Sequence, residues 1–120
     1  MYSVLLGYVI AIVGAVLIHG AMAVNRFYAP VVRIQAERGH EVVECGLYKR
    51  VRHPGNLGNI ILNLATPLML ASNWAWIPVG LSILLTVVRT MLEDRVLCME
   101  LSGYQAFAQR TRSRLIPGVW

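Results

Sequence analysis

The chain has 120 residues, of which 57% are hydrophobic and only 14% are charged. Soluble domains usually carry about a quarter charged residues, so this composition predicts an integral membrane protein and argues against a soluble enzyme. The net charge of +5 would suit nucleic-acid binding, but the basic residues are not interleaved with aromatic stacking residues, and we expect no nucleic-acid partner. The length allows a single domain over 1–120 with about three membrane helices, because each crossing uses roughly 20 residues.

The first apolar segment, Tyr2 to Val24, contains no charged side chain and is long enough to cross a bilayer as a helix. No basic residue precedes the apolar part, which argues against a secretory signal peptide. The basic residues that follow it are Arg26, Arg33, Arg38, Lys49, Arg50 and Arg52. Because positive residues gather on the cytoplasmic side, this end of the span is expected in the cytoplasm and the amino terminus outside.

The segment 25–53 is polar and is expected to lie at the membrane interface. Pro30 is a helix breaker, and Gly39 and Gly46 are turn signals, so we predict an interfacial helix over Val31 to Arg38 followed by irregular loop. His40 follows a glycine within this loop and is expected to be solvated.

The second apolar run, Leu57 to Val88, has no charged side chain. As one helix it would measure about 48 Å, more than a hydrocarbon core of about 30 Å can hold. Ser72 and Asn73 form a polar break in its middle, which predicts a helical hairpin over 55–101 with both ends in the cytoplasm.

The second arm of the hairpin is expected to continue as a helix to about residue 101, because Arg89, Glu93, Val96 and Glu100 recur at helical spacings. Segment 102–120 is then a short basic helix and a tail on the cytoplasmic side. The sequence thus predicts an all-α, integral membrane helical bundle: one span, a helical hairpin and a cytoplasmic C-terminal helix.

A polar stripe runs along the first arm, where Asn56, Asn59, Asn63 and Thr66 repeat every three or four residues. The stripe should face protein, with Asn63 and Thr66 forming interhelical hydrogen bonds. Asn56 lies in the first turn, where free N–H groups and the helix dipole favour an anion. A glycine such as Gly58 lets a ligand approach the backbone closely.

The acidic pair Glu93-Asp94 stands at the end of the second arm and should face the RHPGNLG turn (52–58), since a hairpin brings its two ends together. One interpretation is a pocket with basic and acidic groups on the cytoplasmic side. The alternative is an exposed ion pair between Arg89 and Glu93, one helical turn apart. The spacing of the cysteines and histidines indicates no metal site.

Four motifs resemble those of the isoprenylcysteine carboxyl methyltransferase and phospholipid methyltransferase family of integral membrane enzymes. They are GLYKRVRHPGNLG (46–58), RTMLEDRVL (89–97), GYQAF (103–107) and RLIPG (114–118), and the resemblance covers 25–120. It implies transfer of a methyl group from S-adenosylmethionine to a lipophilic acceptor, isoprenylcysteine carboxylate-like or phospholipid-like. The cofactor would bind on the cytoplasmic side, between the RHPxYxG turn and the acidic pair.

The resemblance, together with the charges of the cofactor, assigns its binding to Tyr48, Arg52, His53, Pro54, Asn56, Leu57, Gly58, Glu93 and Asp94. The chain departs from the family pattern at Asn56 (usually tyrosine), Leu47 (commonly proline) and Asp94 (usually glutamate). A carboxylate acceptor needs no general base, whereas an amine acceptor does, and Glu100 and Asp94 are the candidate catalytic residues.

Two other functions remain open. One is a non-catalytic membrane assembly subunit or degenerate family member. The other is a small multidrug-type transporter, which would need a membrane-embedded carboxylate that neither apolar run contains. Family members usually have further helices before the region that corresponds to Tyr2 to Val24, so a homo-oligomer that completes the pocket by association is possible. The expected partners are otherwise a lipophilic or lipidated substrate and membrane lipids.

Overall fold

The computed structural model of the chain describes residues 1–29 and 33–120. This described part is helical and contains no strand, which confirms the predicted all-α bundle. Its helices are α1 (Tyr2–Val24), α2 (Pro54–Met69), α3 (Trp76–Glu100) and α4 (Tyr104–Arg110), with 3₁₀ turns η1 (Ala36–Arg38), η2 (Gly46–Lys49) and η3 (Asn73–Ala75).

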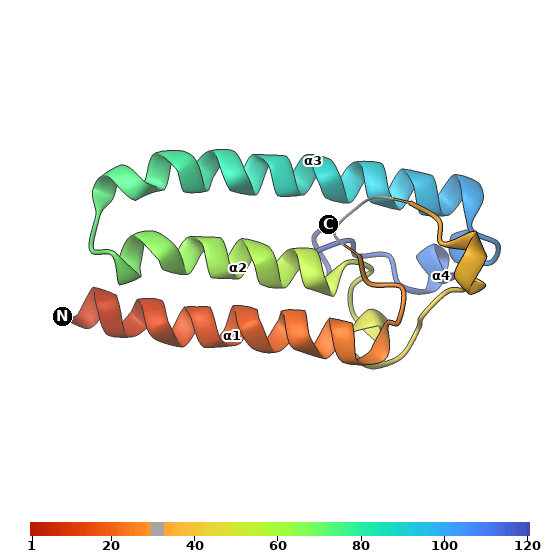
Figure 1. Ribbon diagram of the computed structural model, residues 1–120, viewed down its shortest axis with the longest axis horizontal. Helices are drawn as coiled ribbons and strands as arrows, with labels where there is room; N and C mark the ends of the chain where they lie inside the picture. Colours follow the sequence, from red (N-terminus) through yellow and green to blue (C-terminus); the bar gives the residue numbers. More distant parts are fainter. Residues whose placement is uncertain (30–32) are drawn as a thin grey trace.

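The three long helices lie side by side, each antiparallel to the next along the chain (Figure 1). Among the described residues, two helical segments are long and apolar enough to cross a membrane, Tyr2–Val24 and Asn73–Glu100. Helix α2 has 16 residues. It rises about 24 Å, less than the hydrocarbon thickness of about 30 Å. Of the three membrane helices expected, α2 is therefore a shorter partner packed within the bundle.

Helices α1 and α2 approach each other closely at glycines. A Cβ atom placed on Gly14 would lie 2.8 Å from the carbonyl oxygen of Gly58, and one placed on Gly58 would lie 2.8 Å from that of Gly14. Further along α1, a Cβ on Gly7 would lie 2.8 Å from the main-chain nitrogen of Met69. Small residues allow such contact in membranes, where packing is a main source of helix association. The sequence had suggested that Gly58 lets a ligand approach the backbone. In the structure, α1 occupies the space beside Gly58, so this glycine serves helix packing.

Helices α2 and α3 are joined by polar side chains. The Asn56 amide donates to Thr90 Oγ1 at 3.1 Å, and the Asn59 amide donates to Thr86 Oγ1 at 3.3 Å. The predicted polar stripe thus faces protein at its first two positions. These bonds hold α3 against the start of α2, next to the RHPGNLG turn.

The other two positions of the stripe behave differently from the prediction. The Asn63 amide donates to the carbonyl of Asn59, and the Thr66 hydroxyl donates to the carbonyl of Leu62. Both bonds lie within α2, one helical turn back. The predicted interhelical hydrogen bonds of Asn63 and Thr66 were therefore wrong, because the helix's own carbonyls satisfy these donors.

The predicted interfacial helix over Val31 to Arg38 is not formed in the part that the structure describes. Pro30 and the first two residues of that helix lie outside the described residues, and only Ala36–Arg38 forms a single 3₁₀ turn. Gln35 explains the irregular path: its side-chain amide donates to the Phe27 carbonyl at 2.7 Å, and its main-chain N–H donates to Nδ1 of His40 at 3.0 Å. Side-chain bonds of this kind compete with helix formation.

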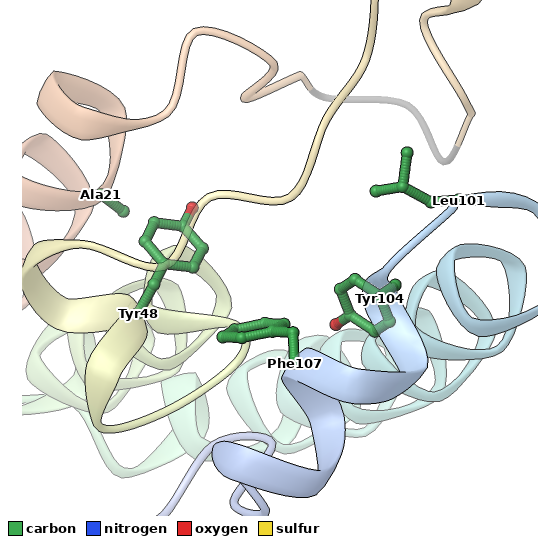
Figure 2. Close-up of a cluster of buried hydrophobic side chains, with 5 residues drawn as sticks. All are labelled: Ala21, Tyr48, Leu101, Tyr104 and Phe107. Atoms are coloured by element: carbon green, nitrogen blue, oxygen red, sulfur yellow. The ribbon is translucent and has the colours of Figure 1, made fainter.

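A small core lies at the polar end of the bundle, beyond the carboxyl end of α1. Figure 2 shows its buried side chains, which are Ala21, Tyr48, Leu101, Tyr104 and Phe107. They come from α1, η2, the end of α3 and α4, so this core fixes the short elements against the long helices. Helix α4 is the short basic helix that the sequence predicted, and α3 extends as expected to the residue before Leu101.

Candidate functional site

A pocket lies at this polar end, between residues 25–29 and 33–43, the start of α2 and the last turns of α3. Five of the residues predicted to bind a cofactor line it together: Tyr48, Arg52, His53, Asn56 and Glu93. The hairpin therefore brings the basic turn and an acidic residue to one place, as its topology required. Five other predicted residues do not line this pocket, namely Pro54, Leu57, Gly58, Asp94 and Glu100.

Asp94 is the centre of a buried network beside the pocket. The side chain is only 6% exposed. Oδ1 accepts from Nε2 of His53 at 3.0 Å and from the Tyr104 hydroxyl at 3.0 Å. Oδ1 also lies 3.3 Å from an Arg52 guanidinium nitrogen, and Oδ2 accepts from Nε of Arg114 at 3.1 Å. Three donors of the chain lie at Oδ1 and one lies at Oδ2, so Asp94 is placed to fix the residues around it.

The backbone of the turn is also anchored. The N–H of Arg52 donates to the Ser113 carbonyl at 2.9 Å, and that of His53 donates to the Arg114 carbonyl at 3.0 Å. The Leu57 N–H donates to the His53 carbonyl at 3.1 Å. Leu57 was assigned to the cofactor site, but its amide is used within α2. The C-terminal segment instead holds the start of α2 in place.

Glu93 faces the pocket and is held by the neighbouring helix. The Asn56 amide donates to Glu93 Oε2 at 3.2 Å as well as to Thr90. The alternative ion pair with Arg89 does not occur among the described residues, because Arg89 donates to the carbonyl of Ala29 at 3.1 Å. Asn56, where the family pattern has tyrosine, thus orients the carboxylate of Glu93.

Two guanidinium groups in the lining carry buried donors that lack partners among the described residues. These are the Nε atoms of Arg52 and Arg89. A buried donor without a partner costs about 1–3 kcal/mol, so an anion that accepted from either atom would be bound favourably. The lining also contains the carboxylates of Glu41 and Glu93. The pocket therefore suits a ligand that carries both negative and positive charge.

Two tyrosines in the lining are neutral hydrogen-bonding groups. Burial raises the pKa of Tyr48 to about 12, and its hydroxyl accepts from the Asn25 amide at 2.9 Å. Burial, followed by the charge of Asp94, raises the pKa of Tyr104 far above its ordinary value. Both phenols therefore stay protonated near neutral pH, and Tyr104 donates to Asp94.

Several pocket residues could not be identified from the sequence, and Tyr28 and His40 are the clearest. Gly55 is buried under Tyr28, since a Cβ atom on Gly55 would lie 2.6 Å from the Tyr28 hydroxyl oxygen and closer still to its ring. The ring of His40, which was expected to be solvated, stacks on Phe27 with centroids 4.4 Å apart. These loop residues follow no helical or strand periodicity that would identify them in the sequence. The one sequence signal is Gly55, whose small size is typical of a position where another side chain packs closely.

The remaining predicted residues have other places. Pro54 is buried at the first position of α2, where proline suits a helix start. Glu100 is exposed at the end of α3 and lies outside the pocket lining. The expectation that Glu100 could act as a base in this site is therefore not supported by its position.

The chain belongs to the isoprenylcysteine carboxyl methyltransferase (ICMT) family, a family of membrane methyltransferases, whose model matches residues 6–99. No curated protein and no solved structure matches the chain. The matched range includes the RHPGNLG turn and both acidic residues, and it extends over most of α1 as well.

Proposed function

We propose that this protein transfers a methyl group from S-adenosylmethionine to a lipophilic acceptor at the cytoplasmic face of a membrane. The observation that carries the proposal is the charge arrangement of the pocket. It combines the Nε atoms of Arg52 and Arg89, which have no partner among the residues that the structure describes, with the carboxylate of Glu93. Membership of the ICMT family supplies the type of reaction.

The residues present fit the cofactor. Its carboxylate would be held by Arg52 and Arg89, whose buried donors need an acceptor. Its amino and sulfonium groups carry positive charge, which Glu93 would balance. The bond from Asn56 keeps the Glu93 carboxylate in place before a ligand arrives. When bound, the cofactor supplies an electrophilic methyl group.

The chain's own residues contribute mainly by positioning. Asp94 fixes Arg52 and His53 at the pocket wall, and the C-terminal segment fixes their backbone. A site whose groups are held in advance needs little reorganisation as the reaction proceeds. Aromatic walls such as Tyr28 and Tyr48 keep bulk water from part of the pocket.

The same geometry favours an acceptor that already carries a negative charge. Neither proposed base lines the pocket: Asp94 lies beside it among donors of the chain, and Glu100 is exposed outside it. A carboxylate acceptor, as in a prenylated cysteine, needs no base, whereas a phospholipid amine does. We therefore rank the carboxylate acceptor above the amine. The pocket is bounded by the ends of α2 and α3, so a lipid chain can extend along these apolar helices.

The test uses the purified chain in detergent. Calorimetry should detect saturable binding of S-adenosylmethionine and of its demethylated product. Labelled cofactor should then transfer its methyl group to a farnesylcysteine analogue, forming an ester that releases methanol in alkali. Absence of cofactor binding would overturn the proposal. Binding without transfer to the prenylcysteine or to a phosphatidylethanolamine would instead favour a non-catalytic family member.

A further inference from the structure

A group of unpaired cations lies outside the pocket, at the same polar end of the protein. Lys49 is the last residue of η2, Arg50 comes directly after it, and Arg112 follows α4; all three are exposed. None of them forms an ion pair with any residue that the structure describes. By contrast, Arg110 pairs with Glu44 close by. We refer to Lys49, Arg50 and Arg112 as the basic surface.

Two hydrogen bonds bring the parts of the basic surface together, although they are distant in sequence. The Thr111 hydroxyl donates to the Tyr48 carbonyl at 3.3 Å, which joins the residues next to Arg112 and Lys49. The Arg52 N–H donates to the Ser113 carbonyl at 2.9 Å. The chain around Arg112 thus lies beside the chain around Lys49 and Arg50. Three cations of the same sign on neighbouring segments make this surface favourable for an anion.

The basic surface lies at the depth where the first apolar helix ends. A Cβ atom on Gly20 would lie 3.2 Å from Leu47 Cδ1, and one on Gly46 would lie 3.5 Å from Val24 Cγ1. Because α1 ends at Val24, η2 packs against its last turns. Lys49 at the end of η2 and Arg50 after it therefore lie where the hydrocarbon of a membrane gives way to headgroups.

Apolar side chains accompany these cations. In the tail that follows Arg112, Ile116 is 49% exposed and Val119 is 76% exposed. The ring of Trp120 lies 5.0 Å from the guanidinium carbon of Arg114. Exposed aliphatic groups, a tryptophan and unpaired cations together are the composition of a segment that lies in a membrane interface.

We propose that the basic surface binds the headgroups of anionic phospholipids. A zwitterionic headgroup offers no net negative charge, whereas an anionic one neutralises the lysine and arginines at the depth where they lie. Bound anionic lipid would also stabilise the contact between η2 and the segment after α4, which lies next to the hydrogen bonds that anchor the turn of the pocket. The inference rests on exposed residues outside the pocket and is independent of the proposed methyl transfer.

The experiment reads lipid selectivity at Trp120. Replacing Trp74 and Trp76 by phenylalanine leaves Trp120 as the only tryptophan, because the chain has 3. The full chain is reconstituted into vesicles of phosphatidylcholine that contain equal fractions of brominated phosphatidylglycerol or brominated phosphatidylcholine. Brominated phosphatidylglycerol should quench Trp120 more strongly, and added salt should reduce the difference.

Matched triple variants assign the selectivity to the basic surface. In K49Q/R50Q/R112Q the preference for phosphatidylglycerol should fall about threefold or more, since each cation near the surface contributes. In K49R/R50K/R112K, which retains all three charges, the preference should persist. Equal quenching by the two lipids in the parent protein, or an unchanged preference in the neutral triple variant, would overturn the proposal. Circular dichroism checks folding; if the neutral triple variant unfolds, K49Q and R112Q measured singly should each show a partial loss.

Discussion

Asp94 on α3 and His53 before α2 are 41 positions apart in sequence, and their side chains are joined by a hydrogen bond of 3.0 Å. The same carboxylate binds Arg114 of the C-terminal segment, whose backbone in turn accepts the His53 N–H. Three segments therefore meet at one buried negative charge. This charge anchors the wall of the pocket. Its loss should therefore lower the stability of the protein and, as a consequence, weaken ligand binding.

Replacing Asp94 by asparagine should destabilise the protein. The substitution leaves the buried Arg52 and its neighbours without their counter-charge, and breaking a buried ion pair typically costs about 3 kcal/mol or more. The free energy of unfolding is measured in detergent by denaturant titration. Glu100→Gln removes a carboxylate from the same helix at an exposed position and should change stability by less than about 0.5 kcal/mol. Equal stability of the two variants would contradict a central role for Asp94.

Helices α1 and α3 could be predicted from the sequence because regular patterns mark their extent. Helix α1 coincides with the charge-free run Tyr2–Val24, and α3 continues past the apolar run as the helical spacing of its polar residues required. Both results follow from one-dimensional patterns: an apolar run long enough to span, and side chains repeating every three or four positions. The irregular segment before α2 has no such period, and contacts of Gln35 decide its path.

The roles of the two acidic residues could not be separated by the same means. Adjacent residues on a helix point in different directions, so Glu93 and Asp94 cannot face one site equally. The structure turns Glu93 to the pocket and Asp94 to a buried cluster of donors. One of those donors, Arg114, lies in a tail with no regular pattern, and its contact with Asp94 depends entirely on tertiary folding.

Gly58→Ala should weaken the packing of α1 against α2. The added methyl group would lie 2.8 Å from the Gly14 carbonyl oxygen and 2.8 Å from Ile18 Cγ1, so one helix must shift. Overpacking of this kind costs about 1–3 kcal/mol, measurable as a lower unfolding free energy. Gly80→Ala is the matched control, since its methyl group would meet nothing within 4 Å and alanine favours a helix. A Gly58→Ala variant at least as stable as Gly80→Ala would contradict the close helix contact.

Cysteine labelling should place both ends of the hairpin on one side of the membrane. In a background without Cys45 and Cys98, cysteines at Lys49 and Arg110 should react with a membrane-impermeant reagent from the cytoplasmic side. A cysteine at Asn73, in the turn between α2 and α3, should not. Figure 1 shows why: α2 and α3 run in opposite directions, so their turn lies at the far end of the bundle. Labelling of positions 49 and 110 from opposite sides would exclude this topology.

The stability of the pocket segment should depend on pH through His40. Burial, and then the charges of Arg33 and Arg38, lower the pKa of His40 below its ordinary value of 6.5. Its Nδ1 accepts the Gln35 N–H, which requires the unprotonated atom. A lowered folded-state pKa gives stability that is present above pH 6.5 and lost as the pH falls through the folded-state value.

The check for His40 compares unfolding free energies of the parent and His40→Asn between about pH 7.5 and pH 5. His19 and His53 are present in both proteins, so the difference isolates His40. The stability advantage of the parent should shrink as the pH is lowered. An advantage that stayed constant over this range would show that protonation of His40 is not linked to folding.

Glu93→Gln should weaken cofactor binding without a comparable loss of stability. The substitution keeps the shape of the side chain and an oxygen that can accept from Asn56, but it removes the negative charge. If Glu93 balances the cationic groups of S-adenosylmethionine, the lost charge-assisted bond should cost about 1.5–3 kcal/mol, or roughly a tenfold to hundredfold weaker affinity. Glu100→Gln removes the same charge from the same helix outside the pocket and should bind like the parent. Calorimetric titrations of the three proteins at matched thermal stability measure the cofactor affinity of each. Equal affinities for the parent and Glu93→Gln would remove this carboxylate from the cofactor site. A loss of affinity confined to Glu93→Gln would place it there.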